Sequence, residues 1–495
     1  MAIVKNILYP YALAELKNEL DGTEHLCFLS DASNHKAFKL YPTLVQYFNI
    51  EKGIQCKILD LSEIPGETSD IIANHLKEIL IKNNLTKKVI GMSADNSNTN
   101  FGGLKRRGLN NIYTKMKSHL NSNIFGIGCN AHIISNAIST ATEELSVSPE
   151  IIIPQIYLYF RNYTVRTETL KEFCDMNETE FRNLLGYSKT RWLALTPSIE
   201  RILYLLEPLR SYFLSQEKIP KILQQFFERV EKSKIYFTFI HNQASIFSDY
   251  ILKIEKTNIS VMEVYKIILE FKQIMKRRLD TSYIPLILRS LISDLEESSP
   301  GFRVNFMKEI NAFYNCCNKY LEEWTTPLEE FKIFGWTLLE NSIINWEDVV
   351  ATVDFLTAKG IEINDGKLLH EVDCANKYCN DTKISKWREE GLSSDMKWVE
   401  IFKHFNNNLI PHNNLLSVIQ FAFALPGTNA AVERVFSIIT DIWSSEKTQI
   451  SIQCLTAQVY LKINLKEKCA DFYNCMKNNN EILKRVHGVE KYIDV

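Results

Sequence analysis

The sequence lacks an excess of charge of either sign. Its 57 Lys and Arg residues nearly balance its 59 Asp and Glu residues, and the formal net charge is -2. A dedicated nucleic-acid-binding module normally carries a basic excess, so the net charge gives no support for DNA binding. Any contact with DNA must therefore depend on local basic groups.

Long apolar runs and a regular cysteine framework are also missing. No uninterrupted apolar stretch approaches the length of a membrane-spanning helix, and the chain opens at Met1 without an apolar leader. The 11 cysteines are scattered, without the spacing of a disulfide-rich protein. We therefore expect a soluble intracellular protein that does not enter a membrane. Its 495 residues predict two or three structural units.

Residues 26–149 carry the clearest pattern of secondary structure. Apolar runs typical of strands alternate with polar turns and helical faces. The expected order is β-β-β-α-β-α-β-α, with strands at 26–31, 37–48, 54–64, 89–95 and 124–129 and the first two helices at about 71–80 and 101–120. This order resembles that of ribonuclease-H-like folds. The predicted fold class is thus α/β (α+β), with a mixed five-stranded sheet as the core.

The middle of the chain predicts helices. Residues 150–395 contain few glycines and long amphipathic stretches, so we expect a large all-helical insertion domain that interrupts the core. Residues 396–465 would complete the core, with a helix that starts at Ala430 after the turn at Pro426.

Three acids are candidates for a metal-binding triad. Asp31 and Asp95 end the first and fourth predicted strands, and Glu433 lies on the helix after the insertion. Carboxylates that hold two Mg²⁺ or Mn²⁺ ions can activate water for phosphodiester cleavage. Taken alone, each aspartate is more often a turn or cap residue, and Glu433 is more often a surface charge.

The strand order favours the triad over these alternatives. We expect the three carboxylates to meet at one edge of the sheet. Because like charges repel when no metal is bound, we also expect the metal-free protein to lose no stability when Asp95 is removed.

Four short motifs follow one another along the chain. They read SADNSNTNFGG (93–103), GCNAHIISN (128–136), TRW (190–192) and PGTNAAVERVFS (426–437). Together they resemble the hAT superfamily of DNA transposases, the group that contains hobo and Activator. The resemblance covers about residues 26–464, and it implies a ribonuclease-H-like core split by a helical insertion. It also implies cut-and-paste transposition with hairpin formation at the flanking DNA.

The resemblance assigns roles by matching position. Asp31, Asp95 and Glu433 match the catalytic acids, which would hold Mg²⁺ or Mn²⁺. The partners would be transposon ends and target DNA, and the expected location is the nucleus.

The same resemblance assigns four residues to DNA binding. Trp192, after Arg191, matches a tryptophan that stacks on a flipped-out base, and stacking regains about 1 to 3 kcal/mol for such a base. Cys129 and His132 match a Cys-x-x-His pair near the active site. A core aromatic and a buried histidine remain the alternatives for Trp192 and His132. No second ligand pair with zinc spacing accompanies Cys129 and His132.

The segments near the two ends of the chain favour different functions. Residues 439–464 resemble a dimerisation segment, so we expect a homodimer or a higher homo-oligomer; the apolar stripe there includes Trp443, Leu455, Val459 and Leu461, with Lys447 beside it. The alternative is that this stripe covers the chain's own sheet. Residues 1–25 show no zinc-finger pattern, and 466–495 form a tail. A catalytically inactive, transposase-derived protein that acts through dimerisation or through DNA or chromatin association is therefore the competing function.

Two kinds of local cluster remain. Lys105 to Arg107 and Lys276 to Arg278 are short basic runs that could neutralise phosphates, although solvated helix faces are the commoner explanation. His370, Cys374 and Cys379 fit no standard zinc spacing, and we interpret them as structural.

Overall fold

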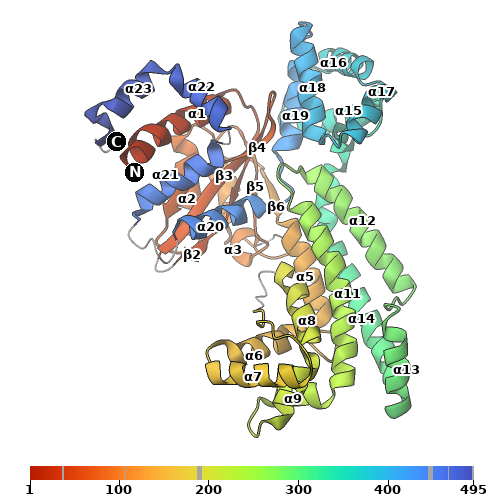
Figure 1. Cartoon of the computed structure of the whole chain (residues 1–495). Helices are drawn as coiled ribbons and strands as arrows, with labels where there is room; N and C mark the ends of the chain where they lie inside the picture. The colour runs from red at the N-terminus through yellow and green to blue at the C-terminus, as the bar shows by residue number, and fades with distance from the viewer. Residues whose placement is uncertain are drawn as a thin grey trace. The chain divides into compact units, whose positions relative to one another are not determined.

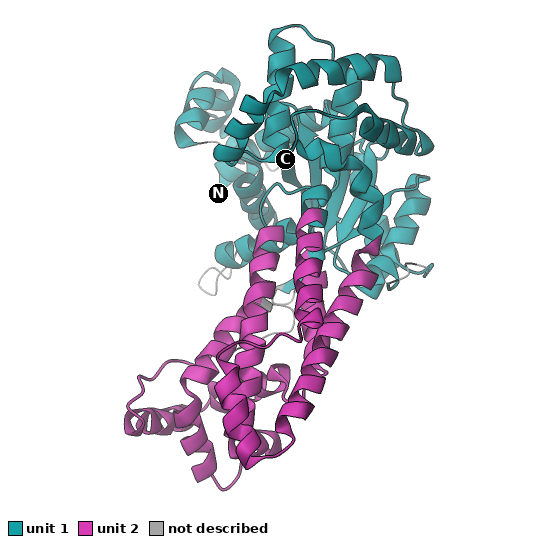
Figure 2. Cartoon of the chain, turned by 90° about the vertical axis from the view of Figure 1, so that its right-hand side faces the viewer, with its two compact units in different colours: residues 1–130, 255–265, 327–495 teal, residues 131–254, 266–326 magenta. Residues whose placement is uncertain are grey.

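The computed structural model describes most of the chain. The described residues are 1–35, 38–104, 106, 108–186, 192–443, 450–465 and 468–492, without the side chains of His35, Trp192 and Glu490. Two compact units divide the chain, as coloured in Figure 2. Unit 1 comprises residues 1–130, 255–265 and 327–495, and unit 2 comprises residues 131–254 and 266–326.

Unit 1 contains a mixed six-stranded sheet (Figure 1). Its strands are β1 (Leu26–Ser30), β2 (Ser33–His35), β3 (Phe38–Asn49), β4 (Gly53–Glu63), β5 (Val89–Ala94) and β6 (Phe125–Gly128). β3 pairs antiparallel with β4 along one edge and with β1 and β2 along the other. β5 is parallel to β1, and β6 is parallel to β5. The expected α/β fold class with a mixed sheet is therefore confirmed.

The prediction of five strands was wrong by one. β2 is a three-residue strand that follows β1 after Asp31 and Ala32 and pairs with the start of β3. Its sequence Ser-Asn-His lacks the apolar alternation by which a strand is recognised. The other five strands lie where the apolar runs predict them.

The expected helix over 101–120 is broken into two. α3 (Asn98–Phe101) ends at Gly102 and Gly103, whose φ angles are 72° and 86°. Glycine adopts this left-handed region without steric cost, so the pair turns the chain out of the helix. α4 (Ile112–Leu120) then begins after Asn111, whose side chain accepts a hydrogen bond from the backbone N–H of Thr114. A new cap and a glycine turn thus replace a continuous helix.

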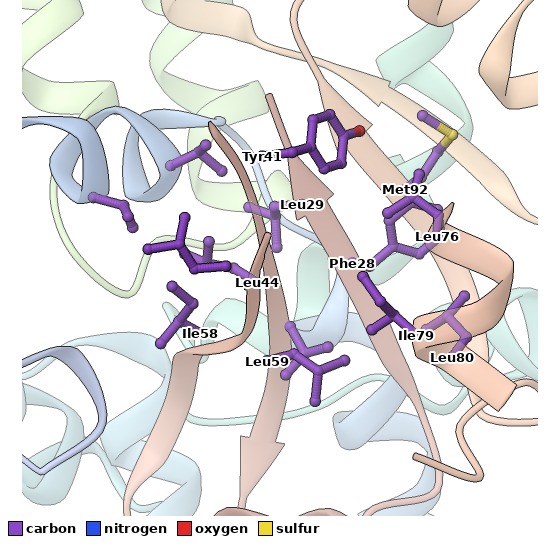
Figure 3. Packing of buried hydrophobic residues seen from close by; sticks show 14 of the residues in the cluster. Phe28, Leu29, Tyr41, Leu44, Ile58, Leu59, Leu76, Ile79, Leu80 and Met92 are labelled. Atoms are coloured by element: carbon purple, nitrogen blue, oxygen red, sulfur yellow. The ribbon is translucent and has the colours of Figure 1, made fainter. Parts of the chain in front are cut away.

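One apolar core joins the sheet to six helices. They are α1 (Tyr9–Asp21), α2 (Ser69–Lys82), α3, α4, α20 (Ala430–Ile442) and α21 (Ile452–Asn464). Figure 3 shows Leu76 and Leu80 of α2 beside Phe28 of β1 and Met92 of β5. Side chains of this kind contribute about 1.5 to 3 kcal/mol each when they are fully buried. Their burial fixes the strands whose ends carry the candidate acids.

A second layer covers the opposite face of β3. The Tyr47 hydroxyl bonds to Glu19 of α1, whereas the next side chain, Phe48, points the other way because side chains alternate along a strand. The Phe48 ring lies 5.6 Å from that of Phe423 on α19 (Asn413–Ala424) and 6.2 Å from that of Phe402 on α18 (Ser394–Asn407). The sheet is therefore buried on both faces.

The remaining elements of unit 1 are helical. They are η1 (Val4–Leu8), η3 (Thr326–Leu338), α15 (Trp346–Ala358), α16 (Asp365–Tyr378), α17 (Asp381–Glu389), α22 (Cys469–Lys477), α23 (Asn480–His487) and η4 (Val489–Tyr492). None of the described helices of the chain combines the length and the low polarity needed to cross a membrane.

Unit 2 is built from helices alone in its described part. They are α5 (Asn130–Thr142), α6 (Pro149–Arg161), α7 (Thr164–Met176), η2 (Trp192–Ala194), α8 (Leu195–Tyr204), α9 (Leu206–Ser215), α10 (Lys221–Glu228), α11 (Val230–Ile254), α12 (Val261–Asp280), α13 (Leu288–Ser298) and α14 (Phe302–Thr325), of which α5 and α12 begin in unit 1. Aromatic pairs hold the unit together, including Phe213 stacked on Phe227 with ring centres 4.8 Å apart. Residues 327–395, expected in the insertion, are grouped with the sheet-containing unit.

Candidate functional site

Asp31 and Asp95 directly follow two neighbouring parallel strands. β1 and β5 pair in a register that sets Leu29 against Ser93, and each aspartate comes two residues later. Because parallel neighbours are about 4.8 Å apart and end at the same edge of a sheet, both aspartates lie at one edge. The Asp31 carboxylate accepts a hydrogen bond from the backbone N–H of Ala32 at 2.8 Å.

Asp95 also holds the turn that follows β5. Its Oδ1 accepts hydrogen bonds from the backbone N–H of Ser97 at 3.1 Å and from Nδ2 of Asn100 at 2.6 Å. The structure therefore gives Asp95 the turn-capping contacts that its local sequence predicts. The expectation that the protein loses no stability without Asp95 needs correction, because the substitution removes two hydrogen bonds from this turn.

Glu433 lies in the first turn of α20. The residue before this helix, Asn429, donates a hydrogen bond from its side-chain amide to the Ser30 carbonyl oxygen at 3.2 Å. Ser30 immediately precedes Asp31, so the start of α20 is fixed at the end of β1. A carboxylate in the first turn is also favoured there by the partial positive charge of the helix N-terminus.

Cys129 connects the end of the sheet to α20. Its backbone N–H donates to the Ala94 carbonyl oxygen at 2.9 Å, which places Cys129 beside Asp95. Its sulfur accepts a hydrogen bond from the Asn429 backbone N–H at 3.4 Å, and a Glu433 carboxylate oxygen lies within 4.8 Å of the sulfur. Cys129 is fully buried, so its thiol is not exposed for the expected contact with DNA.

The backbone contacts of Ser30, Ala94 and Cys129 thus place Asp31, Asp95 and the start of α20 at one end of the sheet. In the described part of the chain, the carboxylate oxygens of the three acids do not all come within 4.8 Å of one another. Oxygen ligands suit Mg²⁺ and Mn²⁺, which prefer carboxylates to sulfur or imidazole. By their chemistry, Asp31, Asp95 and Glu433 offer the oxygen donors that a hard divalent cation prefers.

Gly128 allows the strand end to pack closely. A Cβ at this position would lie 1.8 Å from Oδ1 of Asn96. The Asn96 side chain in turn donates to the Cys129 carbonyl oxygen at 3.0 Å. The turn after Asp95 and the end of β6 are therefore locked together, and any side chain at residue 128 would separate them.

Sequence reasoning missed Tyr41. This buried residue of β3 donates a hydrogen bond to the Ser30 hydroxyl at 2.7 Å. Burial raises the pKa of Tyr41 well above its usual range, and the negative charges of Asp31 and Asp95 raise it further. Tyr41 thus lies close enough to both aspartates to be affected by their charge. Its only signal in the sequence is the strand alternation, which is shared by many core residues.

Two of the residues expected to bind DNA lie wholly or partly outside the part of the chain that the structure describes. Arg191 lies outside the described residues. The backbone of Trp192 starts η2, but its side chain is outside the described part, so neither base stacking nor the core alternative is tested. His132 lies half-buried in the first turn of α5, three residues after Cys129.

The first of the two basic runs is not a simple exposed patch. Arg106 is half-buried: its guanidinium donates to the Gly126 carbonyl oxygen and lies 4.6 Å from the centre of the Phe101 ring. Burial also lowers the pKa of Arg106. Its neighbours at 105 and 107 lie outside the described residues. In the second run, Lys276 and Arg277 are exposed.

The C-terminal apolar stripe covers the chain's own core. Trp443, Leu455 and Val459 are buried in the cluster that contains the sheet, and Leu461 packs against it. The stripe therefore covers the chain's own sheet, which is the alternative to dimerisation given above. Homo-oligomerisation stays a prediction. Lys447 lies outside the described residues.

His370 and Cys374 lie next to each other on α16, and Cys379 follows the end of this helix. His370 Nε2 and Cys374 Sγ are 3.9 Å apart one helical turn from each other. Cys379 is buried at the end of the helix, and burial raises its pKa to about 12. Among the described residues, His370, Cys374 and Cys379 are not a group whose ligand atoms all lie within 4.8 Å of one another. A structural role remains the simplest interpretation.

Comparison with known proteins adds no assignment. No protein-family model matches the sequence, and no curated protein matches it.

Proposed function

We propose that this protein is a metal-dependent enzyme of DNA strand cleavage and transfer, with Asp31, Asp95 and Glu433 as the metal ligands. One observation carries the proposal. The two aspartates follow neighbouring parallel strands, and the helix that bears Glu433 is tied to the residue before Asp31 by the contact between Asn429 and Ser30. Asp31 and Asp95 are 64 residues apart in the sequence, and Glu433 follows 338 residues after Asp95. Local sequence therefore does not account for the placement of these segments at one end of the sheet.

The sheet supports a ribonuclease-H-like core. In this sheet β4, β3 and β1 are antiparallel, and β5 and β6 are parallel to β1. Along the chain, apart from the added β2 and the division of the second helix into α3 and α4, the elements follow the order that the sequence pattern predicts. A helical insertion between β6 and α20 agrees with the same fold, since the described residues from 150 to 395 contain no strand. Fold alone does not specify an activity, so the proposal depends on the acids.

The chain's own residues hold the site in place. The strands fix the backbone of Asp31 and Asp95, and Asp95 is further oriented by the hydrogen bonds to its Oδ1. Sites built on strands and helices keep their geometry better than sites on loops. A pair of Mg²⁺ or Mn²⁺ ions bound by these acids would activate water and stabilise the leaving oxygen.

The resemblance to hAT transposases makes the reaction more specific. On this proposal the enzyme excises DNA by cut-and-paste transposition and forms hairpins at the flanking ends. Transposon ends and target DNA are the substrates, Trp192 and Arg191 contact the flanking DNA, and the protein acts in the nucleus as a homo-oligomer. His132 is retained as a DNA contact, whereas the buried Cys129 is not.

The test is a cleavage assay with matched carboxylate variants. Purified protein is incubated with duplex DNA, including a nicked substrate prone to hairpin formation, in Mn²⁺, Mg²⁺ or Ca²⁺. We expect Mn²⁺-dependent cleavage by the wild type and its loss in Asp31→Asn and Glu433→Gln. Glu63→Gln, at an exposed position in the same sheet, serves as the control and should retain activity.

The competing function predicts a different result. If the wild type neither cleaves DNA nor shows a Mn²⁺-dependent rise in melting temperature, the enzyme proposal fails. DNA binding or dimerisation without cleavage would then favour a non-catalytic, transposase-derived protein.

A further inference from the structure

The start of α20 is attached to the ends of β1 and β6, beside the candidate site. Asn429 bonds through its side chain to the Ser30 carbonyl oxygen and through its backbone N–H to the Cys129 sulfur. Asn130 donates from its side chain to the Gly427 carbonyl oxygen at 2.7 Å. These contacts bring residues about 300 to 400 positions apart into one buried junction.

Cys129 is the centre of this junction. Its backbone N–H bonds to Ala94, next to Asp95, and its carbonyl oxygen accepts from Asn96 on the other side of Asp95. Its sulfur contacts the Thr428 hydroxyl at 3.5 Å as well as the Asn429 N–H. One residue thus links the segment around Asp95 to the two residues immediately before α20.

The junction bears directly on the position of Glu433. Residues four apart in a helix lie on the same face one turn apart, and Glu433 is four residues after Asn429. A shift of the helix start therefore moves the Glu433 carboxylate by a similar amount. Sulfur is a large, weak hydrogen-bond acceptor, so its size matters as much as the bond for the spacing between the strand end and α20.

We infer that Cys129 and Asn429 are positioning residues that set the distance of Glu433 from the aspartates at the ends of β1 and β5. The inference rests on the proposed metal-dependent function and assigns Cys129 a structural part in it instead of a contact with DNA. Neither residue is expected to touch the metal or the scissile phosphate. Their effect should appear in the metal dependence of the reaction.

Substitutions at Cys129 separate the bond from the size of the sulfur. Cys129→Ser keeps a hydrogen-bonding atom but shortens the side chain, and Cys129→Ala removes the acceptor. Loss of a group that orients a metal ligand typically costs 10- to 100-fold in metal affinity or activity. We therefore expect the Mn²⁺ concentration for half-maximal cleavage to rise about 10-fold in Cys129→Ala and less in Cys129→Ser. Excess Mn²⁺ should restore much of the activity.

Cys27 provides the matched control. It is also a fully buried thiol of the same sheet, within β1. Cys27→Ala should lose stability through the cavity that it leaves, as Cys129→Ala does, but should keep the wild-type Mn²⁺ titration. All assays are run well below the lowest melting temperature of the set, so that loss of folded protein does not imitate a change in metal dependence.

Asn429→Asp tests the second contact without changing the size of the side chain. It replaces the donor that faces the Ser30 carbonyl oxygen by a carboxylate oxygen, so the bond is lost and the two oxygens repel. We expect a raised Mn²⁺ requirement here too. This variant keeps the inference testable if Cys129→Ala does not fold.

The outcomes distinguish this inference from the proposed function. A wild type without Mn²⁺-dependent cleavage or thermal shift overturns the metal proposal itself. If the wild type responds to Mn²⁺ but the Cys129 and Asn429 variants titrate like Cys27→Ala, the site is real and the positioning role is wrong. A raised Mn²⁺ requirement in these variants alone supports the inference.

Discussion

Two substitutions at Asp95 separate its structural role from its proposed role as a metal ligand. Asp95→Ala removes the oxygen that accepts hydrogen bonds from Ser97 and Asn100. Asp95→Asn keeps an oxygen that can accept both bonds but removes the negative charge. The two variants should therefore differ in metal-free stability and agree in their failure to bind metal.

The magnitudes follow from the contacts. A hydrogen bond contributes about 0.5 to 1.5 kcal/mol, and somewhat more when one partner is charged. Asp95 is only half-buried, so we take about 1 to 3 kcal/mol for the loss of both bonds in Asp95→Ala. This loss lowers the melting temperature by several degrees. Asp95→Asn should lose less than about 1 kcal/mol, because neutral acceptors are weaker but present.

Thermal melts with and without Mn²⁺ give the second readout. A ligand that binds only the folded state at 100 times its dissociation constant stabilises it by about 2.7 kcal/mol. The wild type should show a Mn²⁺-dependent rise, and both variants should show little. If Asp95→Asn loses as much metal-free stability as Asp95→Ala, the two hydrogen bonds do not hold the turn. A wild-type Mn²⁺ shift in Asp95→Asn would show that Asp95 is not a ligand.

Three further predictions address the surroundings of the site. Gly128→Ala should destabilise the protein by several degrees in a thermal melt, because the new Cβ would lie 1.8 Å from the Asn96 side chain. Tyr41→Phe should cost about 1 to 2 kcal/mol in urea unfolding at pH 8, since it removes the bond to Ser30. Because the pKa of Tyr41 is raised, its contribution is present below the unfolded value near 10 and is lost as the pH rises above it. Burial lowers the pKa of His25 to about 4, so the protein should lose up to about 3 kcal/mol between pH 6.5 and 4, and His25→Gln should reduce this loss.

Each of these has a comparison that could contradict it. Gly366→Ala has no atom closer than 3.8 Å to the new Cβ and lies in α16, so it should be neutral or slightly stabilising. An equal loss in both glycine variants would refute the steric argument. Tyr473→Phe, at an exposed tyrosine, should show no change in urea unfolding. A wild type and His25→Gln with the same slope of stability against pH would mean that His25 does not account for the acid sensitivity.

Much of the sheet could be predicted because its signals are local. Buried strands are short apolar runs between polar turns, and five of the six strands carry that signal. The same reasoning failed for β2, where Ser33, Asn34 and His35 are polar and the pairing with β3 alone makes a strand. It also failed at Gly102 and Gly103, because a glycine pair within a helical pattern breaks the helix only if the backbone takes positive φ there.

The candidate site was predictable only in part. The sequence by itself determined that Asp31 and Asp95 end apolar strands and that Glu433 begins a helix, because strand ends and helix starts follow from neighbouring residues. It did not determine that the charges of Asp31 and Asp95 raise the pKa of Tyr41, nor that the Arg106 guanidinium donates a hydrogen bond to the Gly126 carbonyl oxygen. Those outcomes depend on which strand lies next to which.

Only the tertiary structure decided what the residue before α20 contacts. Cys129 and Asn429 are 300 residues apart, and nothing in the local sequence of either requires the other as a partner. The C-terminal stripe is a similar case, since a buried Leu455 is compatible with a partner chain or with the chain's own sheet. Periodicity shows that a face is apolar. The folded chain decides what covers it, because burial is satisfied by any apolar surface of the right shape.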